Sequence, residues 1–172
     1  MLRALTAIVA VVVVAGCGDH ARTSGHATTS EFGFVQAEGW QTDSTGLHPL
    51  EPQAPAVRAS TTTLDDAPGS VPGQTLKSMP ADGIVIVVYL YRPYGGGPNG
   101  FPPRELPLQL GDAQVSEAWE GQPNPNVPRY QIQSAVSGFW VEADVFFGTQ
   151  RPDDDLASRA QAELARLRLS AA

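Results

Sequence analysis

The chain has few of the residues that most often carry covalent chemistry or staple a fold. It holds one cysteine and three histidines in 172 residues, and Lys77 is its single lysine. One cysteine excludes an internal disulfide, so the folded part must be held by its own hydrophobic core. Lys and Arg number 11 against 18 Asp and Glu, and no basic cluster occurs. Nucleic-acid backbones are bound through such clusters, so we expect no nucleic-acid partner.

The chain also lacks an apolar run long enough to cross a membrane. Its longest stretch runs from Ala4 to Ala15, whereas a spanning helix needs about 20 apolar residues. Arg3 precedes this stretch, and Gly16 and Cys17 follow it. A basic start, an apolar centre of about 7–15 residues and a small-residue end are typical of a secretory signal peptide. We therefore predict a signal peptide over residues 1–16.

The end of this leader, Val14-Ala15-Gly16-Cys17, resembles the lipobox of bacterial lipoproteins. The resemblance implies that Cys17 receives a diacylglyceryl group and becomes the mature N-terminus. Two acyl chains, at about 0.8 kcal/mol per buried methylene, hold a protein stably on a membrane. The expected location is therefore the extracytoplasmic face of the cell membrane, with Cys17 as the lipid anchor. The alternative is an ordinary free or buried thiol.

Residues 17–31 join the anchor to the remainder of the chain. Their small and polar composition has no apolar periodicity, which is typical of a flexible tether. His20 and His26 within it fit solvated linker residues better than metal ligands. The remaining residues, 32–172, are enough for one hydrophobic core, so we predict a single domain there.

The strongest sign of secondary structure is the segment IVIVVYLY, residues 84–91. It is apolar on both faces, which predicts a strand at the centre of a sheet. Ser137-Gly138 separates two further strands and predicts a tight hairpin. Thr75 is expected to cap a short helical turn that Pro80 ends. The other predicted strands lie within residues 32–40, before a break at Gly39-Trp40, and at 56–64, 105–110, 114–120, 130–136 and 139–147.

The last segment predicts a helix that packs on the sheet. Asp153 is a good N-cap after Pro152, and apolar residues recur at helical spacing. Together the elements predict an α+β fold, with an antiparallel sheet, a C-terminal helix on one face and long Pro- and Gly-rich loops. The periodic residues are Leu156, Ala160, Leu164 and Leu167.

Phe32-x-Phe34, Gly39-Trp40, the central strand, the late hairpin and the terminal AELARLRL are similar in layout to small exported lipoproteins of the PsbP/Mog1-like type. The resemblance implies an antiparallel sheet flanked by helices, and commonly an accessory or binding module without known catalysis. The Pro-rich insert at residues 46–56 and the Gly loop at 94–103 depart from that layout. No functional residue is carried over.

Three motifs that suggest chemistry have simpler explanations. Gly95, Gly97 and Gly100 match a dinucleotide-binding pattern, but the prolines within and after it prevent the helix that such a site needs. Consecutive residues 153–155 are all Asp, yet on a helix they fan out by about 100° each and cannot converge on one ion. His48 is a lone loop histidine without a nucleophile motif. We predict no cofactor and no metal site.

The remaining candidate is one face of the strand predicted at 139–147. Glu142 and Asp144 project in parallel about 7 Å apart, a separation that can hold an acid and a base. Trp140 and Phe146 bracket them with the aromatic surface that a partner or sugar site needs. The alternatives are a solvated strand face, or one covered by a helix or loop. We expect a non-catalytic binding or accessory module for a small ligand or envelope protein, with a paired-carboxylate hydrolase as the alternative.

Overall fold

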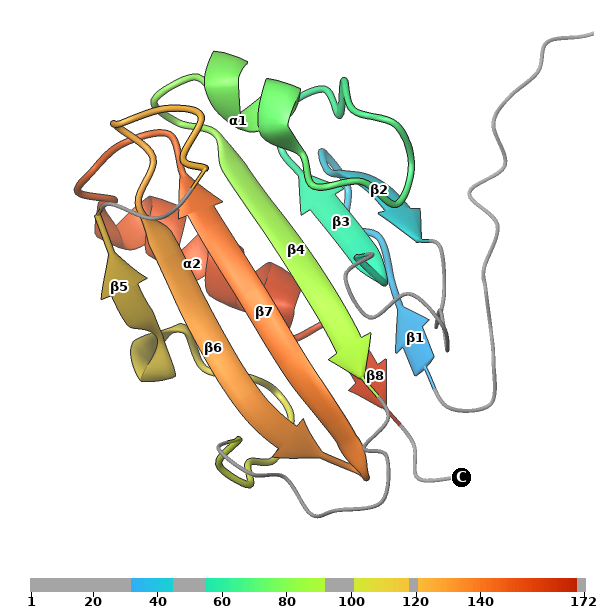
Figure 1. Cartoon of the computed structure of the whole chain (residues 1–172). Coiled ribbons are helices and arrows are strands. Elements are labelled where there is room, and N and C mark those ends of the chain that lie inside the picture. The colour runs from blue at the N-terminus through green and yellow to red at the C-terminus, as the bar shows by residue number, and fades with distance from the viewer. Residues whose placement is uncertain (1–31, 45–54, 92–100, 118–120, 170–172) are drawn as a thin grey trace, which may run out of the picture.

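The computed structural model describes residues 32–44, 55–91, 101–117 and 121–169, and these form an antiparallel sheet with a helix behind it (Figure 1). The predicted α+β fold is thereby confirmed. The six strands lie in the order β2-β3-β4-β7-β6-β5, and every neighbouring pair is antiparallel. Their bounds are β2 Gln41–Ser44, β3 Val57–Ser60, β4 Ile84–Tyr91, β7 Phe139–Phe147, β6 Arg129–Val136 and β5 Gln114–Ser116.

Four smaller elements complete the fold. β1 (Phe32–Phe34) and β8 (Leu167–Leu169) pair with each other in a separate two-stranded sheet. A short helix, α1 (Gly73–Ser78), precedes β4, and α2 (Asp154–Leu164) follows β7. A 3₁₀ turn, η1, covers Leu110–Asp112. Within the described residues no helix combines the length and apolarity needed to span a membrane.

The predicted central strand and hairpin are both confirmed. β4 lies between β3 and β7, and its residues Ile84 to Val88 are buried on both faces, as their unbroken apolar character requires. At the hairpin, Ser137 and Gly138 have φ values of 50° and 82°. Two consecutive positive φ angles give the turn whose twist matches that of antiparallel strands.

The back of the sheet carries the main hydrophobic core. Leu156, Ala160 and Leu164 of α2 pack there against alternate residues of β4 and β7 (Figure 1). The predicted cap is also confirmed, because the Asp153 side chain accepts a 2.9 Å hydrogen bond from the backbone nitrogen of Leu156. The apolar residues of α2 recur with the 3.6-residue period of a helix, and those of β7 with the two-residue period of a strand. Each set therefore lies on one side of its element, and the two sides pack against each other.

Three local predictions are wrong. The last helix ends at Leu164, and Leu167 lies instead in β8, where it pairs with Phe34. Thr75 does not cap α1, since the helix begins at Gly73 and Thr75 is buried within it. Residues 105–110 do not form a strand, and Pro107 lacks the N–H that a strand would use. The short strand β2 was not predicted, because its sequence QTDS has no apolar alternation.

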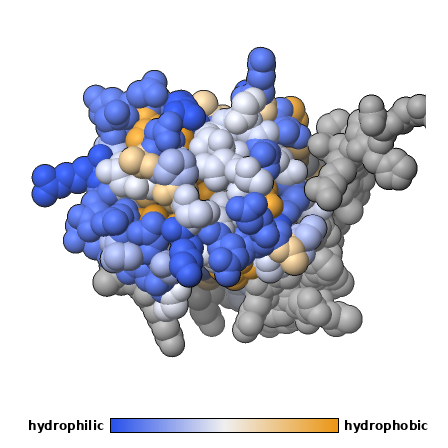
Figure 2. Space-filling model, turned by 90° about the horizontal axis from the view of Figure 1, so that it is seen from above, coloured by the Kyte–Doolittle hydropathy of each residue, from blue (hydrophilic) through white to orange (hydrophobic). Residues whose placement is uncertain are grey.

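Among the described residues, those that cover the front of the sheet lie at one end of it. There α1 contributes Leu76, which packs with Val85, Val87 and Phe146, while Val127 joins from the segment before β6. Figure 2 looks down on this end and shows a mostly hydrophilic surface with small, separate hydrophobic areas. Farther along β4, β7 and β6 no described helix crosses the front face (Figure 1).

Candidate functional site

The uncovered part of the front face collects polar and aromatic side chains from three strands. The register places Tyr89 of β4 opposite Glu142 of β7, and Glu142 opposite Gln133 of β6. Asp144 lies in the next row, opposite Val87 and Gln131. Cross-strand partners share a face, so these side chains form one patch. We call Tyr89, Arg129, Gln133, Glu142 and Asp144 the Arg129 cluster.

Arg129 holds both predicted carboxylates. Its Nη2 lies 3.0 Å from Oε1 of Glu142 and 2.9 Å from Oδ2 of Asp144. The other Glu142 oxygen, Oε2, accepts a 2.9 Å hydrogen bond from Nε2 of Gln133. The structure therefore brings Glu142 and Asp144 together, as their spacing predicted, but joins them through an arginine.

The two acids differ in their surroundings. The Asp144 side chain is 5% exposed and that of Glu142 is 16% exposed. Burial raises the pKa of Asp144 to about 6, although the hydrogen bond and charge of Arg129 and the side chain of Gln131 pull it down, and Glu142 pushes it up. The second Asp144 oxygen, Oδ1, is buried and has no hydrogen-bond partner in the described part of the chain. A buried acceptor without a donor costs roughly 1–3 kcal/mol, and four other buried side-chain atoms of the described residues share this condition.

Two tyrosines extend the patch along β4. The rings of Tyr89 and Tyr91 lie nearly parallel, with centroids 6.5 Å apart and an interplanar angle of 10°. Burial raises the pKa of both phenols, that of Tyr91 to about 12, and the nearby Glu142 and Asp144 carboxylates add to the effect. Both hydroxyls therefore stay protonated and are able to donate as well as accept.

The predicted aromatic residues occupy different positions. Phe146 is buried beneath α1 in the front-face core, so it is not part of an open surface. Trp140 is partly exposed and stacks on Phe101, with ring centroids 5.7 Å apart. Of the four predicted face residues, Trp140, Glu142 and Asp144 therefore border the uncovered patch and Phe146 does not.

Sequence reasoning missed Arg129, Gln133 and Tyr89. A signal was present, because Arg129, Gln131 and Gln133 alternate with apolar or small residues along β6 and so share one face. Pairing that face with the one carrying Glu142 and Asp144 would have predicted the cluster. Tyr89 gave no comparable signal, because its strand is apolar on both sides.

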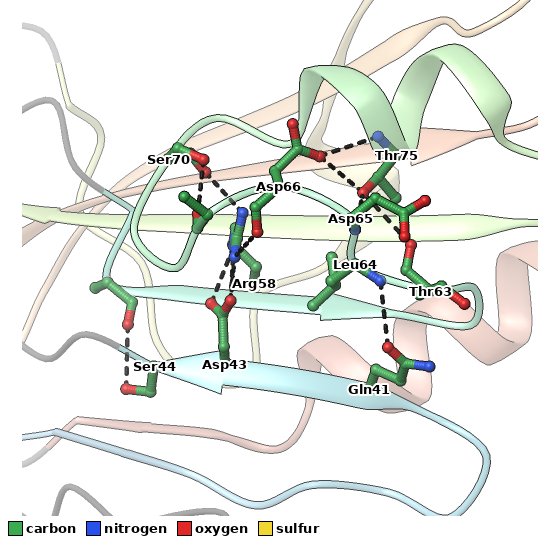
Figure 3. A network of polar contacts seen from close by, with 12 residues as sticks. Gln41, Asp43, Ser44, Arg58, Thr63, Leu64, Asp65, Asp66, Ser70 and Thr75 are labelled. Carbon is green, nitrogen blue, oxygen red and sulfur yellow. Dashed lines mark hydrogen bonds and ion pairs between the residues drawn. The ribbon is translucent and has the colours of Figure 1, made fainter.

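A second arginine on the same face has a different setting (Figure 3). Arg58 of β3 is fully buried, and its Nε and Nη2 both donate to the Asp43 carboxylate of β2. Its Nη1 donates to the carbonyl of Ser70 at 3.0 Å, and Nη2 reaches that of Asp66 at 3.3 Å. We call Asp43, Arg58, Asp66, Ser70 and Thr75 the Arg58 cluster.

The Asp66 carboxylate continues this network into α1. It accepts hydrogen bonds from the backbone nitrogens of Gln74 and Thr75, at 2.9 and 3.0 Å, and from the Thr75 hydroxyl at 2.8 Å (Figure 3). Burial raises the pKa of Asp66, but these bonds and the charge of Arg58 outweigh it, so the net pKa lies below its usual value. The Arg58 cluster thus fixes the loop and α1 to β2 and β3, which is a structural role.

A pocket of about 370 Å³ lies elsewhere, along residues 104–109 and Asp112. An ion pair between Arg104 and Asp112 spans it, with both side chains about one-third exposed. Its walls come from one continuous loop, so it lacks the groups converging from several strands that distinguish the Arg129 cluster.

Several predicted features lie outside the described residues. They are the signal peptide, Cys17 and its tether, His48, and the glycines at 95, 97 and 100. Among the residues that the structure does describe, no group of three or more His, Cys, Asp or Glu side chains is placed to hold a metal ion.

The comparisons with known proteins add no family to this description. No protein-family model, no curated protein and no solved structure matches the chain.

Proposed function

We propose that the chain is a bacterial lipoprotein, anchored through Cys17 at the extracytoplasmic face of the cell membrane, and that its folded part is a non-catalytic binding or accessory module. The anchor is supported by Val14-Ala15-Gly16-Cys17 behind a basic and apolar leader. The partner is an envelope protein or a small ligand, and neither nucleic acid nor a cofactor is involved.

One observation carries the binding role. The Arg129 cluster is partly exposed, it lies where no described helix covers the sheet, and its buried Asp144 Oδ1 accepts no hydrogen bond of ordinary geometry from the described residues. Natural folds satisfy nearly all buried polar atoms, so such an atom in a charged cluster beside partly exposed tyrosines favours a ligand site over a structural contact.

A paired-carboxylate hydrolase is the second candidate, because a pKa of about 6 for Asp144 suits a general acid. The contacts of Glu142 argue against it. Arg129 and Gln133 occupy one oxygen each, so the second carboxylate has no free oxygen aimed at a water or substrate. Binding without turnover is therefore the better-supported function. Hydrolysis that Asp144→Asn abolishes, with the fold intact, would reverse this order.

The anchor is tested by metabolic labelling of the full-length protein with an alkynyl fatty acid in a bacterial host. We expect a labelled, processed protein in the membrane fraction, and an unlabelled precursor for Cys17→Ala. Cys17→Ser is the matched variant, since it keeps a small polar side chain but cannot form the thioether. Wild-type labelling of either variant would contradict the anchor.

The binding face is tested by hydroxyl-radical footprinting of intact cells and of the purified full-length protein. We expect Tyr89 and Tyr91 to be oxidised more slowly in cells, where an occupant covers them. Tyr130 is the internal reference, because it lies on the opposite face and packs edge-on against Phe147. Equal rates for Tyr89 and Tyr91 in both samples would contradict an occupied face.

A further inference from the structure

We propose that the Arg129 cluster binds a saccharide, with the sugar lying across β4, β7 and β6. This proposal rests on the binding function proposed for the same face and adds the chemical class of its ligand. It follows from three properties of the cluster: its charge, its unused hydrogen-bonding groups and its aromatic borders.

The charge of the cluster disfavours an ionic ligand. Glu142 and Asp144 share one cation, Arg129 Nη2, at 3.0 and 2.9 Å. An anion at this face would meet two carboxylates, whereas a cation would meet the guanidinium held between them. An uncharged ligand meets neither repulsion, so the presence of both signs of charge within one small cluster favours a neutral polar molecule.

The unused hydrogen-bonding groups match a polyhydroxyl ligand. In the described part of the chain, Arg129 uses only Nη2 in hydrogen bonds, which leaves Nε and Nη1 as donors. Asp144 Oδ1 accepts no hydrogen bond of ordinary geometry from the described residues, and the Tyr89 hydroxyl is able to donate or to accept. Sugar hydroxyls donate and accept at once, so one donating to Oδ1 could accept from the neighbouring guanidinium. The same hydroxyl would remove the cost of the orphan oxygen.

Aromatic rings border these polar groups at the far end of the patch. Tyr89 and Tyr91 stand along β4, and the Phe101–Trp140 stack lies beside them, because Tyr91 and Trp140 are cross-strand partners. Sugar rings carry apolar C–H surfaces as well as hydroxyls. A site of aromatic side chains around a few convergent polar groups is the usual composition of a small-molecule site.

The test is a titration of the full-length protein, held in micelles of a detergent without sugar groups, with maltose, cellobiose and N,N′-diacetylchitobiose. Saturation-transfer NMR reports which sugar binds and gives its dissociation constant. We expect at least one to bind, and Tyr89→Phe and Gln133→Ala each to weaken it about three- to tenfold, the usual effect of one lost hydrogen bond. Tyr130→Phe removes the same hydroxyl from the opposite face and should leave the dissociation constant unchanged.

Two results would overturn the proposal. One is that none of the three sugars binds, or that a sugar binds equally well to Tyr89→Phe, Gln133→Ala and the parent protein. The other is that a tetralysine or a tetraglutamate peptide binds, sensitive to the same variants, while the sugars do not. The second result would overturn the saccharide and keep the binding face, so the two proposals fail separately. Unchanged thermal unfolding of Tyr89→Phe checks that its fold is intact.

Discussion

The two arginine clusters lie on the same face of one sheet but differ in how completely their hydrogen bonds are satisfied. The Arg58 side chain is 1% exposed and donates through all three of its nitrogens, whereas that of Arg129 is 25% exposed and donates through one to the described residues. Asp43, Arg58, Val87, Asp144 and Gln131 even share one cross-strand row, with buried Val87 between the two clusters.

The cover on the sheet explains the difference. Residues 61–78 fold back over β3 and supply the Ser70 and Asp66 carbonyls that complete Arg58 (Figure 3). No corresponding described segment supplies carbonyls to Arg129. A satisfied polar network holds a fold together, while a partly satisfied one leaves donors and acceptors available, and this contrast is the reason for proposing the Arg129 cluster as the binding face.

The largest expected effect on stability comes from breaking the Arg58 cluster. Asp43→Asn leaves the fully buried Arg58 without its counter-charge, which should destabilise the protein by about 3–5 kcal/mol in urea unfolding. The matched control, Asp112→Asn, breaks the surface pair with Arg104 and should cost less than about 1 kcal/mol. Similar losses for both variants would contradict the structural role of Arg58.

The corresponding substitution in the Arg129 cluster, Asp144→Asn, should stabilise the protein at neutral pH. The folded-state pKa of Asp144, about 6, lies above its unfolded value of 3.8, so stability from its bound proton is fully present below pH 3.8. That stability is lost as the pH rises through about 6, and the loss amounts to at most about 3 kcal/mol.

Asp144→Asn keeps the side chain neutral at every pH and so removes this loss. We expect the free energy of unfolding of the parent protein to fall more steeply between about pH 4 and pH 7 than that of the variant. Urea titrations at both pH values measure the difference, and Asp155→Asn at the exposed start of α2 serves as control. Parallel pH profiles for the parent protein and Asp144→Asn would rule out the raised pKa.

A smaller effect on stability is expected from a substitution at Thr75, at the edge of the Arg58 cluster. Thr75→Val removes the hydroxyl that donates to Asp66 at 2.8 Å and accepts from the backbone nitrogen of Asp65 at 3.1 Å. Because Thr75 is fully buried, the loss should be roughly 1–2 kcal/mol of unfolding free energy. Thr62→Val, on the neighbouring loop, provides a control, and a loss as large there would show that the effect is not specific to the network.

The smallest expected effect on stability comes from a substitution in the Arg129 cluster. The Tyr89 hydroxyl makes no hydrogen bond within the described residues, so Tyr89→Phe should change the free energy of unfolding by less than about 0.5 kcal/mol. Differential scanning calorimetry of the full-length protein measures this. A loss as large as that of Thr75→Val would mean that the hydroxyl supports the fold and would weaken the contrast between the clusters.

Much of the fold followed from local patterns. The apolar segment at residues 84–91, the Ser137-Gly138 turn and the Asp153 cap were predicted because each depends on residues close in sequence. Leu167 was assigned to the wrong element because its burial is equally satisfied by a helix or by β8. Only the antiparallel pairing of β8 with β1, which lies near the start of the described residues, decides between them by supplying backbone hydrogen bonds at Phe32↔Leu169 and the two neighbouring pairs.

The sequence by itself determined the α+β class, the central strand, the hairpin before β7 and the parallel projection of Glu142 and Asp144. These follow from the repeating directions of side chains along strands and helices, which depend only on residues a few positions apart. The tertiary structure decided which polar residues meet: Arg129 with two acids of β7, and Arg58 with Asp43 and the loop before α1. It also decided that one arginine is enclosed and the other left partly open, because burial and hydrogen-bond satisfaction depend on segments that only the folded chain brings together.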